Sequence, residues 1–172
     1  MRFHFPIWSL PNRKTETFVL AAAVVLGHLA GIWLSSAAGE QIPDVVRILS
    51  DGAAFPGRIA VLLLPLLCSA GAVYVGQPVL LLPIAFWKAL SFSYVFSGLS
   101  FSWTGAGWLV GSLSMFSGFL SLPVLCWYWL RHLDGRSFDL SGFLTALVFL
   151  LAIALADFWV ISPFLLNIIT FR

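Results

Sequence analysis

The hydrophobic positions of this chain fall into five long apolar stretches, separated by short segments that are rich in charged residues, glycine or proline. A bilayer core of about 30 Å requires about 20 apolar residues of helix. Five membrane-spanning helices are therefore predicted, at about residues 18–38, 59–75, 79–99, 106–130 and 140–161. Composition agrees, because 60% of the residues are hydrophobic and only 9% are charged, whereas a soluble domain carries about 25% charged residues.

These features predict an all-α fold: a polytopic transmembrane helix bundle in which residues 1–172 form a single integral membrane domain. We expect a multi-pass protein of the cell inner (cytoplasmic) membrane, with the lipid bilayer as its first partner. The apolar stretches are interrupted by Pro65, Pro83, Pro123 and Pro163. Neighbouring helices must satisfy the backbone groups that proline leaves unbonded, so a compact bundle is expected. Ser162-Pro163 is predicted to break or kink the last helix.

The most hydrophilic stretch lies between the first two spans, at residues 39–58. Its apolar residues recur at helical spacing opposite charged ones, with Val45, Val46, Ile48 and Leu49 opposing Asp44, Arg47 and Asp51. This pattern predicts a short amphipathic helix that lies at the membrane interface. The segment is also large enough to contact a soluble partner.

Lysine and arginine counts in the short loops predict the orientation of the bundle. With the N-terminus inside, the cytoplasmic side carries Arg2, Arg13, Lys14, Arg131 and Arg136. The outer side then carries Arg47, Arg58 and Arg172. This imbalance favours an inside N-terminus, an outside C-terminus and an outer 39–58 segment.

Small residues recur at a spacing near four in two of the predicted spans. Gly27 and Gly31 would let another helix approach the first span closely, although glycine is common in membrane helices in any case. The fourth span carries the longer series Gly107, Gly111, Ser114 and Gly118. This series predicts that the fourth span packs inside the bundle. The run Trp127, Tyr128 and Trp129 at its end is typical of an interfacial aromatic belt.

Three ionisable residues, His28, Lys88 and Asp157, fall inside apolar stretches. Such groups are costly at bilayer depth and are usually paired or functional. One hypothesis is that Lys88 and Asp157 pair or share a water-filled pocket. The alternative is that serine hydroxyls, backbone carbonyls or the interface satisfy each of them separately. His28 fits either a hydrogen-bonded packing role or a proton relay with the other two residues.

The sequence offers no recognisable catalytic or metal-binding set. Cys68 and Cys126 lie in apolar runs without CxxC or Cys/His spacing, so we expect them to be small buried hydrophobic residues. Neither an HExxH nor a GxSxG motif occurs. The 9 basic and 7 acidic residues are too evenly balanced for a nucleic-acid surface. We therefore expect no enzyme activity, no cofactor, no metal and no nucleic-acid partner.

Motifs in the second half resemble those of the stage II sporulation protein M family, and the resemblance extends over roughly residues 15–170. The matching residues are Gly76 and Pro78 in a turn, Lys88 in the next span, Pro123 after the polar pair Ser117-Gly118, and Asp157 shortly before Ser162-Pro163. The chain departs from the family pattern in four places: the loop after the first span is short, the acidic residue is displaced by about one position, and two motif positions differ. Ala89 replaces the glycine that usually follows the lysine, and Ser117-Gly118 replaces a Gln-Asn pair.

The resemblance implies a non-enzymatic membrane scaffold. In sporulation such a protein recruits membrane-anchored peptidoglycan-degrading partners, the stage II proteins D and P, during engulfment. Some relatives look more like permease-type subunits of export systems. The alternative function is therefore a membrane subunit of a transporter that uses a polar site around Lys88 and Asp157. The corresponding partners are cell-wall hydrolases, transporter subunits or further copies of the chain.

Overall fold

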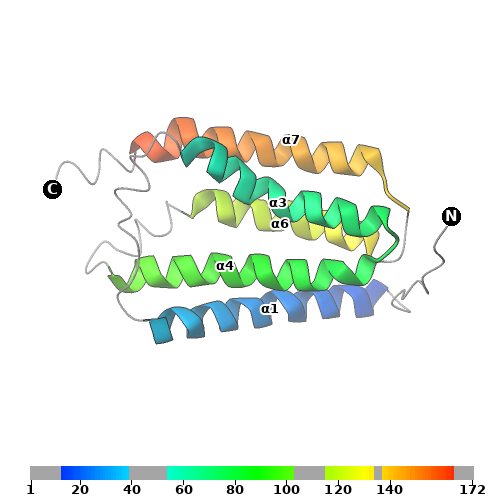
Figure 1. Ribbon diagram of the computed structural model, residues 1–172, viewed down its shortest axis with the longest axis horizontal. Helices are drawn as coiled ribbons and strands as arrows, with labels where there is room; N and C mark the ends of the chain where they lie inside the picture. The colour runs from blue at the N-terminus through cyan, green and yellow to red at the C-terminus, as the bar shows by residue number, and fades with distance from the viewer. Residues whose placement is uncertain (1–12, 39–53, 103–114, 134–136, 165–172) are drawn as a thin grey trace.

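The computed structural model describes residues 13–38, 54–102, 115–133 and 137–164, and every regular element among them is helical (Figure 1). The long helices are α1 (Arg13–Ala38), α3 (Ala54–Tyr74), α4 (Leu81–Ser102), α6 (Phe116–His132) and α7 (Leu140–Ala156). A 3₁₀ turn, η1 (Pro78–Leu80), precedes α4, and a π-helical turn, η2 (Asp157–Ile161), continues α7. The predicted all-α fold is confirmed for this part of the chain.

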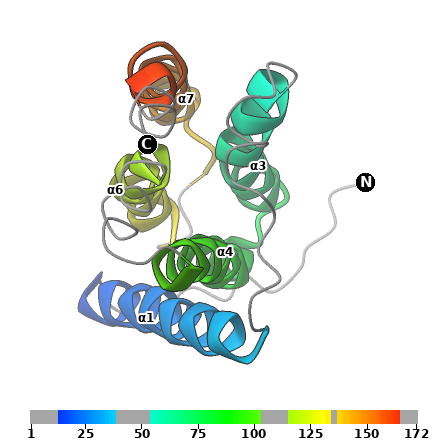
Figure 2. The same ribbon diagram turned by 90° about the vertical axis from the view of Figure 1, so that its left-hand side faces the viewer.

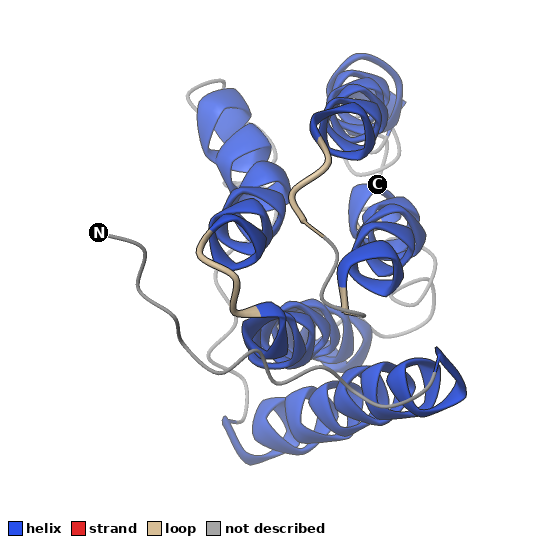
Figure 3. Cartoon of the chain, turned by 90° about the vertical axis from the view of Figure 1, so that its right-hand side faces the viewer, coloured by secondary structure: helices blue, strands red, loops and turns tan. Residues whose placement is uncertain are grey.

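The long helices lie side by side in a bundle. α1, α4 and α7 run in one direction, and α3 and α6 run in the other (Figure 1). Seen from either end, α4 lies between α1 and the other helices, and α7 lies on the side away from α1 (Figure 2, Figure 3). α1 packs chiefly against α4, whereas α7 packs against α3 and α6.

Among the described residues, three helical segments are long and apolar enough to cross a membrane: Lys14–Ala37, Pro78–Gly98 and Leu140–Phe164. A shorter apolar helix covers Ile59–Tyr74. Large hydrophobic side chains face outward from these segments, among them Phe18, Trp33, Trp87 and Trp159. An exposed apolar surface of this extent is favourable in hydrocarbon and unfavourable in water. The described helices are therefore typical of an integral membrane protein.

A hydrophobic core lies between α3, α4, α6 and α7. It is formed by Leu66 and Val73 of α3, Leu81 and Ala85 of α4, Leu125 and Trp129 of α6, and Ala146 and Leu150 of α7. Most of these positions recur at spacings of about four, which places them on one face of each helix. α1 reaches this core through Leu20 near its beginning.

Two glycines bring α1 against the backbone of α4. A Cβ atom at Gly27 would collide with the carbonyl oxygen of Phe86, and one at Gly31 would collide with that of Leu90. The Cβ at position 31 would also lie only 2.9 Å from the Cβ of Ser93. The two backbones therefore approach where larger side chains would separate them, as in other small-residue contacts between membrane helices.

Gly118 gives α6 a similar close approach to α4. A Cβ at this position would lie 2.6 Å from the Phe92 ring, and that ring also meets Phe119 edge-on at 4.7 Å between centroids. The other small residues of the predicted series, Gly107, Gly111 and Ser114, lie outside the described residues.

Several helix ends differ from the predicted spans. α1 begins at Arg13 rather than 18, and α3 begins at Ala54, inside the segment predicted as an outer loop, whose amphipathic part lies outside the described residues. α4 begins at Leu81 rather than 79, because the turn from Pro78 precedes it, and continues to Ser102. α6 begins at Phe116 rather than 106, after Met115, whose φ of −99° and ψ of 10° lie outside the helical range. Small residues such as glycine and serine are common inside membrane helices as well, so they do not mark such ends.

The predicted turn at Gly76-Gln77-Pro78 is confirmed. Gly76 has a φ of 77°, a left-handed conformation that glycine adopts without steric cost. Its N–H donates to the carbonyl of Val73, and the N–H of Gln77 donates to the carbonyl of Ala72. These two bonds satisfy carbonyls that the end of α3 would otherwise leave unbonded.

The last helix does not break at Ser162-Pro163. It forms a wider, π-helical turn just before this point. Proline has no N–H, and its ring clashes with the carbonyl four residues earlier. The backbone adapts through η2, in which the N–H of Ser162 bonds to the carbonyl of Asp157. Helix then continues to Phe164.

Replacing Gly31 with alanine is expected to destabilise the protein, because the added methyl group would enter the α4 backbone. Overpacking of this kind costs about 1–3 kcal/mol, which should lower the thermal unfolding temperature in detergent. Gly71→Ala is the matched control, since a Cβ there meets no atom within 4 Å and alanine favours helix. Equal unfolding temperatures for the two variants would contradict the close contact.

Candidate functional site: polar residues inside the bundle

Lys88 lies inside the bundle, with 8% of its surface exposed. On α4 it shares a face with Leu81 and Phe92, which stand seven residues before it and four residues after it. Leu81 belongs to the core, and Phe92 packs against Gly118 of α6. Lys88 therefore lies on the side of α4 that faces the other core helices, away from the Leu90 side that contacts α1.

Asp157 lies at the end of the buried stripe of α7, with 6% of its surface exposed. The stripe consists of Gly142, Ala146, Leu150 and Ala154. Residues at this spacing share one helix face, so Asp157 continues the face that is turned toward the bundle. The π turn that begins at Asp157 lies beside α6.

The structure does not bring Lys88 and Asp157 together. α4 and α7 begin at the same end of the bundle (Figure 1), with Lys88 seven residues after Leu81 and Asp157 seventeen residues after Leu140. At 1.5 Å per residue, the two positions differ by about 15 Å along the bundle. This separation is too large for an ion pair, which requires about 4 Å between the charged atoms, so the pairing hypothesis receives no support.

His28 belongs to the contact between α1 and α4. Its Nδ1 atom shares a hydrogen bond with the hydroxyl of Ser93, and its ring meets Phe92 edge-on at 5.9 Å between centroids. Ser93 and Ser97 are buried on α4, and Ser35 is buried on α1. Ser93 thus serves helix packing, and the structure does not assemble His28, Lys88 and Asp157 into one relay.

A buried hydrogen-bond chain joins α6 to α3. The indole N–H of Trp129 donates to the hydroxyl of Ser69 over 2.8 Å, and that hydroxyl donates to the carbonyl of Pro65 over 2.6 Å. Trp129 and Ser69 are fully buried. The sequence pattern does not predict this pair. Its available signal was a lone serine in an apolar span, which needs a partner when hydrocarbon surrounds it.

A second polar group lies where α6 ends and α7 begins. Arg131 forms an ion pair with Asp139 over 2.6 Å, and its guanidinium lies 5.6 Å from the ring centre of Trp127. Asp139 also caps α7 by accepting a hydrogen bond from the N–H of Ser141. These contacts hold the arginine across the gap between the two helices.

Two expectations about residue exposure are wrong. Trp127 is exposed, but Tyr128 and Trp129 are fully buried, so this run is not an interfacial belt. Successive helical residues point about 100° apart, and only one of the three can face lipid squarely. Cys68 is exposed rather than buried, like the adjacent Leu67 on the outer side of α3. Cys126 is partly buried.

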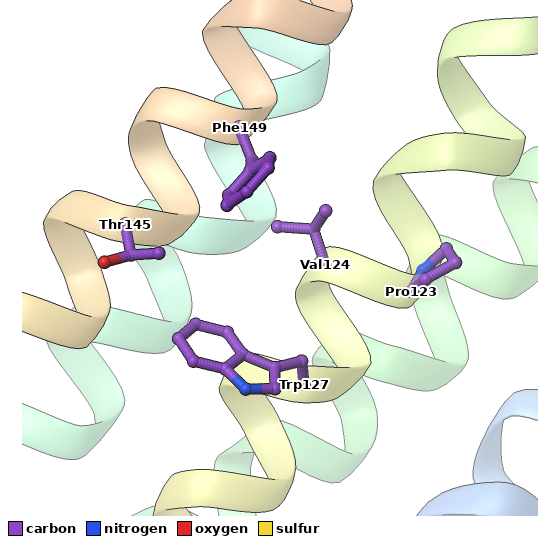
Figure 4. A pocket seen from close by; sticks show the side chains of 5 residues that line it. All are labelled: Pro123, Val124, Trp127, Thr145 and Phe149. Atoms are coloured by element: carbon purple, nitrogen blue, oxygen red, sulfur yellow. The ribbon is translucent and has the colours of Figure 1, made fainter.

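Two hollows lie on the outer, apolar side of α6 and α7. The first measures about 340 Å³ and is lined by Pro123, Val124, Trp127, Thr145 and Phe149 (Figure 4). The second measures about 680 Å³ and follows α7 from Leu140 to Phe149. In the described part of the chain, no group of three or more His, Cys, Asp or Glu side chains could hold a metal ion.

The residues that carry the family resemblance are spread along the bundle. Gly76 and Pro78 form the turn before α4, Pro123 lies exposed within α6, and Pro163 follows the π turn. Each of these residues affects the backbone of its own helix, by ending, interrupting or widening it. Comparison of the chain with family models, curated proteins and solved structures gives no match.

Lys88→Met and Asp157→Asn are expected to act independently, because the two residues lie far apart. Their effects on the free energy of unfolding should add within about 0.5 kcal/mol in the double variant. The measurement is chemical unfolding of the four proteins in the same micelle. A double variant much more stable than the sum predicts would establish an interaction between the two residues.

Ser69→Ala should destabilise the protein by about 1–3 kcal/mol, because it leaves the buried indole N–H of Trp129 without its acceptor. In the Ser69→Ala/Trp129→Phe double variant that N–H is absent, so part of the loss should be recovered. A double-mutant cycle of unfolding free energies measures this coupling. Additive effects would show that the hydrogen bond contributes little.

Proposed function

We propose that the chain is a non-enzymatic integral membrane scaffold that recruits or assembles partner proteins. By its resemblance to the stage II sporulation protein M family, its partners would be membrane-anchored peptidoglycan hydrolases. The observation that carries this proposal is the use of interior polar groups to fix helices to one another. Ser69 joins α3 to α6, and Ser93 joins α4 to α1. A scaffold requires such a fixed surface.

The proposed topology has five spans in the cell inner (cytoplasmic) membrane, with the N-terminus inside and the C-terminus outside. The alternating direction of the successive long helices supports it (Figure 1). The 21 residues of α3 give about 31 Å of helix, and the 17 residues of α6 give about 25 Å. A shorter span can be accommodated by local thinning of the bilayer.

A membrane subunit of a transporter is the second candidate, and the burial of Lys88 and Asp157 favours it. Ionisable groups inside a bundle often mark a substrate or proton path. Asp157 also begins a π turn, a feature that is frequent at functional sites. Such a subunit would require a partner or a second copy, since five spans are few for a complete transporter.

Variants in two regions should separate these functions. Under the scaffold proposal, Arg47→Glu in the 39–58 segment weakens partner recovery on the order of tenfold, the effect of about 1.4 kcal/mol of lost interface energy. Lys88→Met should leave recovery unchanged. The measurement is mild crosslinking in the native membrane, purification of the full chain and identification of attached proteins.

The opposite pattern would reject the scaffold in favour of transport. In that case Lys88→Met abolishes function while Arg47→Glu has little effect, and an ATPase or permease subunit co-purifies. Cell-wall hydrolases among the attached proteins would support the scaffold. Thermal unfolding of each variant controls for loss of the fold.

A further inference from the structure

We propose that the gap between α6 and α7 binds a single phospholipid with an anionic headgroup, the acyl chain in the outer hollows and the phosphate beside Arg131. This site is independent of the scaffold proposal. Figure 4 shows Val124 and Trp127 of α6 facing Thr145 and Phe149 of α7 across the gap. The lining is almost wholly apolar, as an acyl chain requires.

The length of the groove favours a lipid over a partner helix. The two hollows adjoin, because Thr145 and Phe149 line both of them. The second is lined by α7 alone and extends from Leu140 to Phe149, about 14 Å of helix at 1.5 Å per residue. This is close to one leaflet, half of a hydrocarbon core of about 30 Å. A membrane-spanning partner helix would need a groove of twice this length.

The charged end of the groove provides the headgroup site. Arg131 follows Trp127 by one helical turn, and Ser141 precedes Thr145 by one turn. The guanidinium lies over Trp127 and against the start of α7, and its side chain is partly exposed. It therefore stands at the mouth of the groove, where basic residues between membrane helices bind lipid phosphates.

Asp139 forms a 2.6 Å ion pair with the guanidinium of Arg131. The carboxylate positions the arginine but also opposes an incoming anion. Its removal should therefore strengthen phosphate binding, provided that α7 keeps its cap. Asparagine is as good a helix cap as aspartate, so Asp139→Asn removes the charge while conserving the hydrogen bond to Ser141.

The test is native mass spectrometry of the delipidated full chain, titrated with phosphatidylglycerol or phosphatidylcholine that have the same acyl chains. The unmodified protein should prefer phosphatidylglycerol by about fivefold, the effect of one basic residue near a headgroup of net negative charge, which the choline group of phosphatidylcholine cancels. Arg131→Gln should abolish this preference, Arg131→Lys should retain it and Asp139→Asn should increase it. Lys14→Gln, which removes a charge at the same end of the bundle, should leave it unchanged.

A separate variant tests the part of the site that would bind the acyl chain. Thr145→Phe fills the groove, so it should weaken binding of both lipids while leaving the preference between them. Circular dichroism and gel filtration confirm that each variant is folded. A preference that survives Arg131→Gln, or lipid binding unaffected by Thr145→Phe, would overturn the proposal. Inorganic phosphate that binds as tightly as the lipid would do so too.

Discussion

Hydrocarbon does not hydrogen-bond, and this constraint accounts for much of the structure. A buried polar group that finds no partner within the protein therefore carries a large energetic cost. Proline has no N–H, so it leaves one backbone carbonyl of its helix without the usual donor. Near Pro163 the helix responds by widening, so that Ser162 bonds to the carbonyl of Asp157. Near Pro65 the neighbouring Ser69 hydroxyl bonds to the proline's own carbonyl and accepts from Trp129 of another helix. Of these two sites, the one at Ser69 also attaches its helix to a neighbour, α6.

The same solvent removes the usual reason for helices to associate. Lipid tails are as apolar as leucine, so burying leucine gains little there, and close packing and polar contacts decide which helices meet. α1 illustrates this, because Gly27 and Gly31 admit the α4 backbone and His28 adds a hydrogen bond to Ser93. Its long outer face carries Phe18 and Trp33 toward lipid. The attachment of α1 therefore rests on a narrow strip of small residues.

Helix type and approximate position could be predicted from the sequence because apolar length is a strong signal. Helix ends could not, since the serines on both sides of the start of α6 at Phe116 are equally common inside membrane helices. The intramembrane charges at Lys88 and Asp157 were recognised, but their separation depends on where each helix begins in the bundle. The Ser69–Trp129 contact joins positions 60 residues apart, and no local pattern reveals such a pair. The composition of the chain thus indicates that lipid surrounds it, but only the packed bundle shows which residues of different helices contact one another.

The burial of Lys88 bears differently on the two proposed functions. In a scaffold, a lysine among core helices must be held by local groups, and its cost is a fixed part of the folded state. In a transporter subunit, the same charge needs water or a substrate to reach it. The two hollows described on this bundle lie on the outer side of α6 and α7, and Lys88 lines neither of them. The hydrogen bonds of Ser69 and Ser93 tie helices together, and a fixed arrangement of helices of this kind is what the proposed scaffold requires.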